Sequence, residues 1–398
     1  MAIGIKDKVA IIGMGCAKFG ERWDTDGPGL MVEAFQEAIA DAGIDPLEIE
    51  AGWFGHAGNA VGPGAIPLAK ALRLHNIPMT RVENACATGT EALRGAAYAV
   101  ASGACDIAVA LGMEKLKDSG YGGLAAASRG PFYDATNANL TAPGAFAQLA
   151  SGYAARHGID GPDLKRAMAH VSVKSHENAL RNPKAHLHRR ITEHQAIEAP
   201  IVAAPLGLYD CCGVSDGAAC AIVTTPDIAR SLGKTDIVSI KALQLAATAG
   251  WEAQGQGWDF SYVPTTRAAT ARAYREAGIE NPREELSLTE VHDCFSITEL
   301  VTMEDLGLSE DGQAWRDILD GKFDADGKLP CQIDGGLKCF GHPIGASGIR
   351  MVYENYLQLL GRAGERQRTE PVRNALAHNL GGAPFHGICS ISIVGLLG

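Results

Sequence analysis

The sequence repeats itself once over a very long interval, and this repeat limits the folds open to the chain more than any other feature. Residues 38–57 and 273–295 each pass from a helix ending in Ala-Gly-Ile, through an acidic turn, into an apolar strand and a histidine-bearing loop. Residues 84–103 and 341–361 each place a reactive side chain at the glycine-rich start of a helix. Two copies about 240 residues apart indicate a duplicated domain, because solenoid proteins repeat every 20 to 50 residues.

Each copy alternates apolar strand-like runs with amphipathic helical runs, so the sequence predicts an α/β fold with two similar βαβ-rich halves. We expect residues 1–114 and 205–245 to form the first half and residues 246–398 to form the second. Residues 115–204, where Gly, Asn and Pro interrupt the pattern, are expected to form an inserted loop subdomain. Two like halves would face each other across a pseudo-twofold axis, and their matched loops would converge on one cleft.

The charge balance excludes one broad class of function. The chain of 398 residues carries 35 basic and 46 acidic side chains, which gives a formal net charge of −11. Because binding to nucleic acid depends on neutralising phosphates with Lys and Arg, we expect no nucleic-acid partner. An anionic ligand would need a local basic region, and residues 156–194 contain eight Lys or Arg against four Asp or Glu.

The cysteine pattern and the apolar segments point to the cytoplasm. Ten cysteines in 398 residues are too sparse for a disulfide scaffold, and no paired CxxC motifs stand at zinc-ribbon spacing. The first residues lack the long apolar core of a secretory signal. The most apolar stretch, residues 95–113, contains Asp106 and runs directly into Glu114 and Lys115, so we expect no membrane span.

Cys86 stands directly before a run of small, helix-forming residues, in the segment Val-Glu-Asn-Ala-Cys-Ala-Thr-Gly. A thiolate at the first turn of a helix is stabilised by the helix dipole, so we expect a lowered pKa and a nucleophile at neutral pH. The alternative is a buried structural cysteine, which is the commonest environment of a single Cys. The local sequence leaves both interpretations open.

Two further segments carry reactive side chains. His342 precedes Pro343, which suits the first turn of a helix, and a histidine beside a thiol can accept its proton as a general base. His292 and Cys294 follow an apparent strand, where an extended backbone would turn both to one side and Asp293 to the other. The alternatives are a core or capping histidine at position 342 and a polar loop with an incidental cysteine at position 294.

Five motifs, in this order, resemble those of the thiolase superfamily, in particular its sterol-carrier-protein-type and archaeal-type members. They are Asn-Ala-Cys-Ala-Thr-Gly at 84–89, Ser-Asp-Gly-Ala-Ala at 215–219, His-Asp-Cys-Phe at 292–295, a glycine-rich segment at 335–348 and His-Asn-Leu-Gly-Gly at 378–382. The resemblance covers nearly the whole chain. It implies a thiolase fold of five α-β-α-β-α layers. It also implies a CoA-dependent acyltransferase that cleaves 3-oxoacyl-CoA with CoA or runs the reverse Claisen condensation.

The resemblance implies a role for each matched residue. Cys86 would be acylated, His342 would activate it, and His292 would position an oxyanion-stabilising water. Cys294 would exchange the proton on the attacking or leaving carbon. This set supplies the nucleophile, base and proton donor that a Claisen reaction needs, with coenzyme A as substrate and no metal or redox cofactor.

The resemblance also implies partners and a ligand-binding region. Thiolase folds are generally homodimers, and several relatives of this type bind a small companion protein with a zinc ribbon and an OB-fold. The inserted region contacts CoA in the family, which would give the basic stretch at 156–194 a function; a solvated basic face at a subunit contact is the alternative. We expect Tyr121, Tyr133 and Phe146 to shape the acyl pocket, although the acyl group itself stays open.

Two departures from the family pattern fall near the C-terminus. Many thiolases carry the proton-exchanging cysteine in a Cys-x-Gly-Gly loop, where this chain has Asn379. Cys294 would then perform that exchange, while Gly381 and Gly382 remain available to donate backbone N–H groups beside the acyl oxygen. The segment Ala-Pro-Phe-His-Gly at 383–387 interrupts an apolar final strand, and it either reshapes the acyl pocket or is a surface loop.

Alternatives remain at one residue and for the whole chain. The repeat matches His56 to the loop that carries His292, so His56 is a candidate for the cleft near Cys86, with a structural role as the alternative. Related lyases are retro-aldolases on branched or steroid-like acyl-CoA, although they generally carry tyrosines where this chain has His292 and His342. A non-catalytic thiolase-fold subunit would keep the fold alone.

Overall fold

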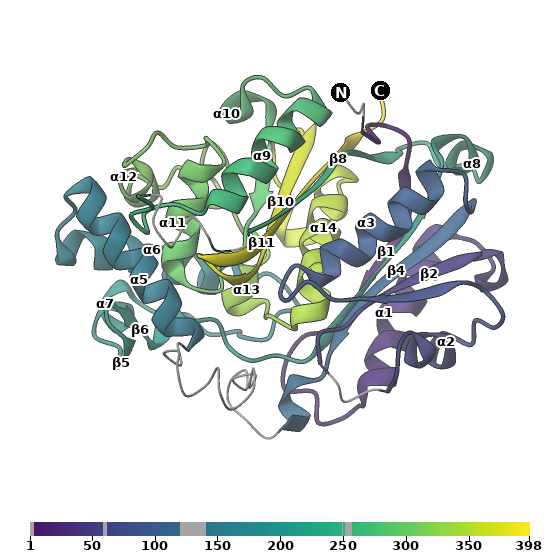
Figure 1. Ribbon diagram of the computed structural model, residues 1–398, viewed down its shortest axis with the longest axis horizontal. Coiled ribbons are helices and arrows are strands. Elements are labelled where there is room, and N and C mark those ends of the chain that lie inside the picture. Colours follow the sequence, from purple (N-terminus) through teal and green to yellow (C-terminus); the bar gives the residue numbers. More distant parts are fainter. Residues whose placement is uncertain (1–3, 59–61, 120–140, 249, 251–256) are drawn as a thin grey trace.

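Nine strands form one mixed sheet in the part of the chain that the computed structural model describes, residues 4–58, 62–119, 141–248, 250 and 257–398 (Figure 1). From one edge to the other they are β3 (Met79–Val82), β2 (Ala51–Gly55), β4 (Ile107–Glu114), β7 (Gly217–Thr224), β1 (Ala10–Cys16), β8 (Val238–Ala247), β11 (His386–Leu396), β10 (Asn374–Ala383) and β9 (Leu288–Glu290). A separate small sheet pairs β5 (Ile201–Ala203) with β6 (Leu206–Gly207).

The strand order confirms the internal duplication. The first half has β2, β4, β7 and β1 as successive neighbours, and the second half has β9, β10, β11 and β8 in the same arrangement. Directions match as well, because β2–β4 and β9–β10 are parallel while β4–β7, β7–β1, β10–β11 and β11–β8 are antiparallel. The strand β3, parallel to β2, is present in the first half alone. The halves meet where Ala10 of β1 lies opposite Ser239 of β8, and Ile11 opposite Val238.

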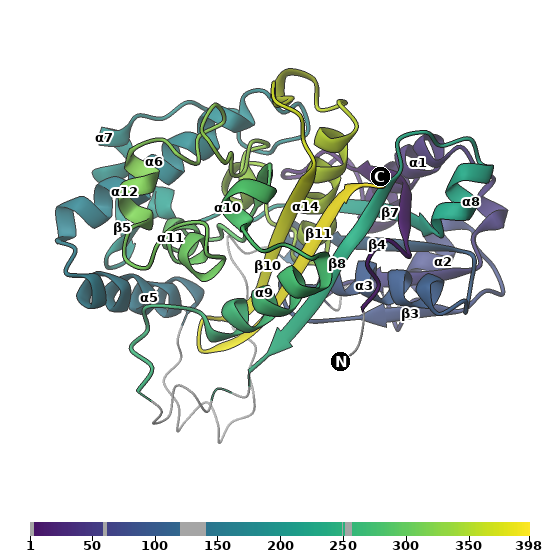
Figure 2. The same cartoon turned by 90° about the horizontal axis from the view of Figure 1, so that it is seen from above.

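The pairing of β8 moves the boundary between the halves. This strand lies antiparallel to β11 along most of its length, so the topology places it in the second half. The boundary therefore precedes Val238 rather than falling at residue 246. Figure 2 shows β8, β11 and β10 side by side.

Helices separate and cover the two halves of the sheet. They are α1 (Gly27–Ala42), α2 (Ile66–Leu72), α3 (Thr88–Ala101), α8 (Pro226–Ser231), α9 (Pro264–Ala277), α10 (Pro282–Glu285) and α14 (Ile344–Leu359), with short 3-10 turns η1 (Pro46–Glu48), η2 (Leu116–Ser119), η3 (Leu208–Asp210) and η5 (Gly364–Arg366). The helix α14 packs against α3 and against strands of both halves, whereas α1 covers β1 and β7 and α9 covers β8 and β11. This arrangement has the five expected layers, with α3 and α14 in the middle (Figure 1).

The helix ends also repeat. The helix α1 ends at Gly43 with φ of 72°, and α9 ends at Gly278 with φ of 73°. At both ends the backbone leaves the helix through the left-handed conformation, which glycine adopts without strain. Each end leads into the matched strand, β2 or β9. The loops after these two strands carry His56 and His292.

The inserted region is helical. Its described part contains α5 (Ala142–His157), α6 (Gly161–Ala179) and α7 (Glu193–Ile197), and the side chains of Thr141 and Asp160 cap the first turns of α5 and α6. It packs against α11 (Ser296–Asp305), α12 (Ala314–Leu319) and α13 (Gly336–Cys339). These three helices form a second insertion, between β9 and α14, which the sequence pattern does not predict. Tyr121 and Tyr133 lie outside the described residues.

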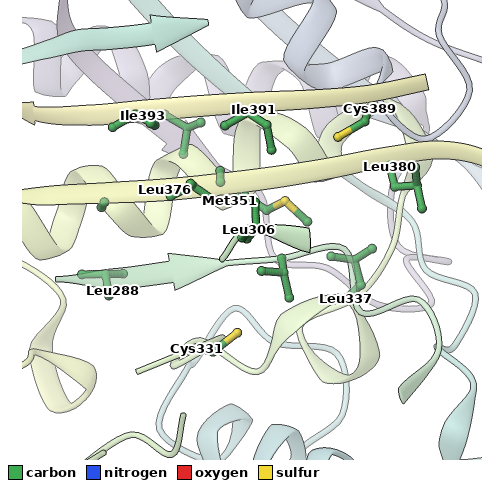
Figure 3. Close-up of a cluster of buried hydrophobic side chains, with 14 of the residues drawn as sticks. Leu288, Leu306, Cys331, Leu337, Met351, Leu376, Leu380, Cys389, Ile391 and Ile393 are labelled. Atoms are coloured by element: carbon green, nitrogen blue, oxygen red, sulfur yellow. The ribbon is translucent and has the colours of Figure 1, made fainter. Parts of the chain in front are cut away.

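A hydrophobic core supports the strands and helices from which the candidate residues extend. Side chains from β9, β10, β11, α11, α13 and α14 meet in it, together with the segment before α13 (Figure 3). Those labelled are Leu288, Leu306, Cys331, Leu337, Met351, Leu376, Leu380, Cys389, Ile391 and Ile393. Because such cores are packed as densely as organic crystals, the end of β9 and the start of α14 are held rigidly. None of the described helices combines the length and hydropathy needed to cross a bilayer.

Candidate active site

Three of the expected residues meet at one point between the halves. Cys86 lies one residue before the N-cap of α3, and His342 lies one residue before the N-cap of α14. The Sγ atom of Cys86 and one ring nitrogen each of His292 and His342 lie within 4.8 Å of one another. The two imidazole rings stand edge to face, with centroids 5.0 Å apart. The duplicated halves thus bring their matched helix starts together.

A tight turn presents the thiol of Cys86. Ala85 has φ of 48°, a conformation that non-glycine residues seldom adopt and that is found at functional sites. The backbone N–H of Ala87 closes the turn onto the carbonyl of Asn84 at 3.0 Å. Gly381 of β10 lies flush against this turn, where a Cβ would overlap the carbonyl oxygen of Asn84. Gly381 therefore lets the second half approach the nucleophile closely.

The thiol of Cys86 is not acidified by its helix start, contrary to our expectation. Burial raises its pKa to about 12, and although the backbone N–H of Gly382 bonds to the sulfur and acts in the opposite direction, the nearby Glu114 and Glu83 add to the rise. Desolvation and the two carboxylates raise the pKa by more than the backbone N–H groups lower it. The resting group is a neutral thiol, so its attack on a substrate requires a base.

His342 has the tautomer that such a base needs. Its Nδ1 lies 2.8 Å from Ser347 Oγ, and Ser347 donates its only proton to the carbonyl of Pro343 at 2.9 Å. Ser347 must therefore accept the Nδ1–H of His342, which leaves the lone pair on Nε2. Burial, with the charge of Arg350, lowers the pKa of His342 to about 3, so the ring is neutral at physiological pH.

His292 has the opposite tautomer. The side-chain amide of Asn379 donates to Nδ1 of His292 at 3.1 Å, while Asn379 Oδ1 accepts from Thr90 at 2.9 Å. The proton of the His292 ring therefore lies on Nε2, which is a donor. Burial, with His342, His378 and Arg350, lowers its pKa well below the usual value. One neutral imidazole thus offers a lone pair and the other a hydrogen.

Residues that local sequence did not single out hold the His292 loop. The backbone N–H of His292 donates to Nδ1 of His378 at 3.3 Å, and Nε2 of His378 lies 3.1 Å from Thr266 Oγ1. Thr90 and Ser347, which orient the two catalytic candidates, were also missed. These residues are identified only by their contacts in the folded structure, although His378 is part of one of the sequence motifs.

Gly382 presents a donor at the sulfur of Cys86. Its φ is 85°, and a Cβ there would overlap the carbonyl oxygen of His386, so the position requires glycine. Gly382 is exposed, whereas Cys86 is half-buried. The turn at 383–387 joins β10 to β11, and Phe385 lies 6.4 Å from Phe260, ring centroid to ring centroid.

The region beside Phe260 is hollowed. A cavity of about 610 Å³ lies between α5 and the segment at 259–260. It is lined by Phe260 and by small residues such as Gly144, Ala147 and Ala203. Phe146, also on α5, packs its ring 4.6 Å from that of Phe295, directly after Cys294.

Cys294 lies beside the three grouped residues without joining them. Its Sγ is 3.9 Å from Thr298 Oγ1, and burial, together with the neighbouring thiols of Cys212 and Cys86, raises the pKa of Cys294 well above its usual value. Asp293 accepts the N–H of Leu337 at 2.6 Å, and its own N–H donates to the carbonyl of Val291 at 3.0 Å. The backbone therefore turns here, after the end of β9, instead of continuing the extended segment that the sequence predicts.

A further cysteine accompanies Cys294. The backbone N–H of Cys212 donates to the carbonyl of Cys294 at 2.9 Å, and burial raises the pKa of Cys212 to about 12. Sequence reasoning overlooked it, although a Cys-Cys pair at 211–212 was visible at the end of the insertion.

His56 is bound within its own half. It is buried, and its Nδ1 lies 2.9 Å from the carbonyl oxygen of Met113 and 3.2 Å from Glu114 Oε1. The same carboxylate accepts the N–H of Ala57 at 2.5 Å. These bonds join the end of β2 to the end of β4, and they favour the structural role for His56.

The basic stretch at 156–194 is largely neutralised by ion pairs. Its paired side chains are Arg156 with Asp259, Lys165 with Asp210, Arg166 with Asp163 and Glu193, Lys174 with Glu299, Lys184 with Glu37, and Arg190 with Glu177. Four of these six cations take a partner from outside the stretch, so its sequence charge overstates the charge it presents. Arg181 and Arg189 make no ion pair with the described residues.

The Cys86, His292 and His342 atoms are also close enough to hold a metal ion. A ligating imidazole must offer a lone pair, and His292 carries its proton on the ring nitrogen left free by Asn379. The hydrogen bonds therefore favour proton transfer and hydrogen bonding over metal ligation at this site.

Comparisons with known proteins identify the family. The family model "Thiolase, N-terminal domain" matches residues 9–227, and "Thiolase C-terminal domain-like" matches residues 247–392. The acetyl-CoA acetyltransferase of Methanothermobacter thermautotrophicus is 38% identical over 94% of this chain and 96% of its own. Sterol carrier protein 2 of Gallus gallus is 30% identical over 94% of this chain and 70% of its own. A solved structure described as "Ltp2-ChsH2(DUF35) aldolase" shares the fold, with a TM-score of 0.84 over 98% of both chains at 23% identity. The chain therefore belongs to the thiolase family.

Proposed function

We propose that this protein is a CoA-dependent acyltransferase that cleaves 3-oxoacyl-CoA with CoA, or runs the reverse Claisen condensation, through an acyl-enzyme on Cys86. The observation that carries this proposal is the convergence of the Cys86 thiol, a lone-pair imidazole and a hydrogen-donating imidazole within 4.8 Å. Relatives named acetyl-CoA acetyltransferase support the reaction class.

In the cleavage direction, Cys86 gives its proton to Nε2 of His342 and its sulfur attacks the 3-oxo carbon. The carbonyl oxygen becomes negative and accepts hydrogen bonds from Gly382 N–H and from a water held by His292 Nε2–H. Donors already placed for this oxygen lower the barrier because they need no reorganisation. Neutral imidazoles suit both roles, since a protonated His342 could not accept the proton.

The C2–C3 bond then breaks and its electron pair leaves with the acetyl-CoA enolate. Cys294 supplies a proton to C2, which the Asn379 substitution in the family's usual cysteine position makes necessary. A thiol with a raised pKa is suited to deliver a proton rather than to lose it beforehand. The product of this half-reaction is acetyl-CoA, with the shortened acyl group on Cys86.

The second half-reaction restores both thiols. The incoming CoA gives its proton to the Cys294 thiolate and attacks the Cys86 thioester. The departing Cys86 sulfur recovers its proton from His342, and the shortened acyl-CoA is released. Coenzyme A is thus a substrate, and these steps use only groups of this chain.

Intact-protein mass spectrometry tests the covalent step. After mixing with acetyl-CoA, the wild-type protein should gain the mass of one acetyl group, and Cys86→Ala should not. Cys294→Ala should still gain it, but more slowly, because the departing CoA sulfur loses its proton donor while the Cys86 nucleophile and its base remain. Absence of an adduct on the wild-type protein would overturn the proposal.

Retro-aldol cleavage is the alternative within the same fold, since one solved neighbour is titled an aldolase. That reaction has no use for a nucleophilic thiol between two imidazoles. The geometry around Cys86 therefore favours thiolysis, and an unreactive Cys86 would be the result that favours the lyase.

A homodimer is the expected assembly. The strand β3 is the outer edge of the sheet, and its residues are partly exposed rather than covered by the described chain. Open edges invite pairing, so two copies joined through β3 would remove it. Light scattering after size exclusion should give about twice the chain mass, and a monomer would contradict this assembly.

A small companion protein is a second proposed partner, supported by the neighbour whose title names a DUF35 assembly. The β5–β6 hairpin exposes Ile201 and Val202, and the η3 turn directly after it exposes Leu208, which gives an apolar surface suited to such a contact. A reducing cytoplasm is the proposed location, since all ten cysteines are unpaired.

A further inference from the structure

Arg350 is a fully buried cation that touches neither Cys86 nor its two imidazole partners. It lies on α14, two helical turns after His342. Its Nη1 donates to Glu290 Oε2 at 2.6 Å and to Asp334 Oδ2 at 2.5 Å. The face of Phe340 lies beneath the guanidinium, with 5.2 Å between the central carbon and the ring centroid.

The two carboxylates belong to the segments that carry the imidazoles. Glu290 is the last residue of β9, and His292 follows two positions later. Asp334 uses its other oxygen to accept the N–H of Gly336 at 2.8 Å, and so fixes the start of α13, from which the chain runs directly to His342. One guanidinium nitrogen therefore ties the His292 segment to the His342 segment.

We propose that Arg350, Glu290 and Asp334 form a clamp that positions His292 and His342 relative to each other and to Cys86. This inference rests on the proposed function of those imidazoles. Arg350 is a positioning residue in it, because it acts through the two carboxylates and not on the substrate.

The clamp predicts an effect on rate that stability alone would not produce. Removing one partner of a buried ion pair destabilises the fold, but if the pair is purely structural, the molecules that remain folded should react at the normal rate. Misplacing a catalytic group by about 1 Å, in contrast, costs roughly 100-fold in rate. Measuring rate and stability on the same variants therefore distinguishes a positioning role from a purely structural role.

The chain offers a closely matched control. Glu354 is also fully buried on α14, and it is held by Arg366, whose Nη2 donates to Glu354 Oε2 at 2.9 Å. Neither Glu354 nor Arg366 bonds to the segments that carry His292 and His342. Glu290→Gln and Glu354→Gln thus replace two equally buried carboxylates by amides, and only Glu290 belongs to the clamp.

The experiment measures single-turnover acetylation of Cys86 by acetyl-CoA, its dependence on acetyl-CoA concentration, and the melting temperature. We expect Glu290→Gln to lower the limiting rate by about 10- to 100-fold with little change in the half-saturating concentration. Glu354→Gln should lower the melting temperature by a similar amount, yet Cys86 in this variant should be acetylated at nearly the wild-type rate. Arg350→Lys, which keeps the charge, should recover part of the rate lost in Arg350→Met.

Equal rates for the two Gln variants, whether normal or reduced, would overturn the clamp. If Glu290→Gln does not fold, the comparison of Arg350→Lys with Arg350→Met decides, and equal rates there also reject the proposal. A wild-type protein that is never acetylated would reject the proposed function instead, so the two failures are distinguishable.

Discussion

The side-chain amide of Asn379 donates to Nδ1 of His292 over 3.1 Å, and this bond determines which ring nitrogen carries the proton. The orientation of the amide follows from Thr90, whose hydroxyl donates to Asn379 Oδ1. The residue that marks the chain's departure from the Cys-x-Gly-Gly pattern therefore sets the tautomer of His292.

Asn379→Asp should reverse that bond. A carboxylate accepts from Nδ1–H, so the ring proton leaves Nε2 and the ring no longer donates toward the acyl oxygen. We expect kcat for thiolysis of acetoacetyl-CoA to fall by about 100- to 1,000-fold, the range for loss of one oxyanion donor, with a smaller effect on KM. Thr90→Ser keeps the hydroxyl and should behave like the wild type. Normal kcat in the Asp variant would show that the tautomer is unimportant.

His378 should make stability depend on pH. Burial lowers its pKa to about 3 in the folded protein, below the value of about 6.5 in the unfolded chain. Between these values the unfolded chain binds more protons, so the contribution is fully present above pH 6.5 and is lost as the pH falls toward 3.

His378→Asn keeps an acceptor for the His292 N–H and removes this proton linkage. Asp293 and Asp305, whose pKa values are raised by burial to about 6 and about 7, act in the opposite sense in both proteins. We therefore expect the difference in unfolding free energy between variant and wild type to vary below pH 6.5 and to be constant above it. Urea titrations from pH 4 to 8 measure it, and a constant difference throughout would disprove the linkage.

The raised pKa of Cys86 should appear in its alkylation. Because only the thiolate reacts, the rate constant with iodoacetamide should increase about tenfold per pH unit from pH 7 to 10 without a plateau. Peptide mapping follows the Cys86 site, and the exposed thiol of a small peptide serves as the reference. A plateau near neutral pH would restore the lowered pKa that the helix start suggests.

Gly381→Ala should damage the active site, because its Cβ would overlap the carbonyl oxygen of Asn84. Backbone cannot move aside as a flexible side chain can, so we expect a loss of about 1–3 kcal/mol in stability and slow acetylation of Cys86. Gly161→Ala, at the start of α6 with open space around its Cβ, is the control and should change neither. A fully active Gly381→Ala protein would contradict the close approach of the halves.

The duplicated fold and the grouping of Cys86 with His342 could be predicted because both rest on patterns that the sequence repeats. The pKa of Cys86 could not be predicted, since it depends on burial by the opposite half and on Glu114, which is distant in sequence. The charge that the basic stretch presents could not be predicted for the same reason, because the carboxylates that pair with Lys165 and Lys174 come from outside it.

One polypeptide contains both halves of the fold, and the antiparallel contact of β1 with β8 joins them into one sheet. Two separate identical half-length chains would be forced to present the same side chain at both central helix starts, either a pair of thiols or a pair of imidazoles. Joining the lobes removes that constraint. One lobe kept a sulfur at position 86 while the other kept a ring at position 342, so a division of labour became possible that a symmetric ancestor could not encode.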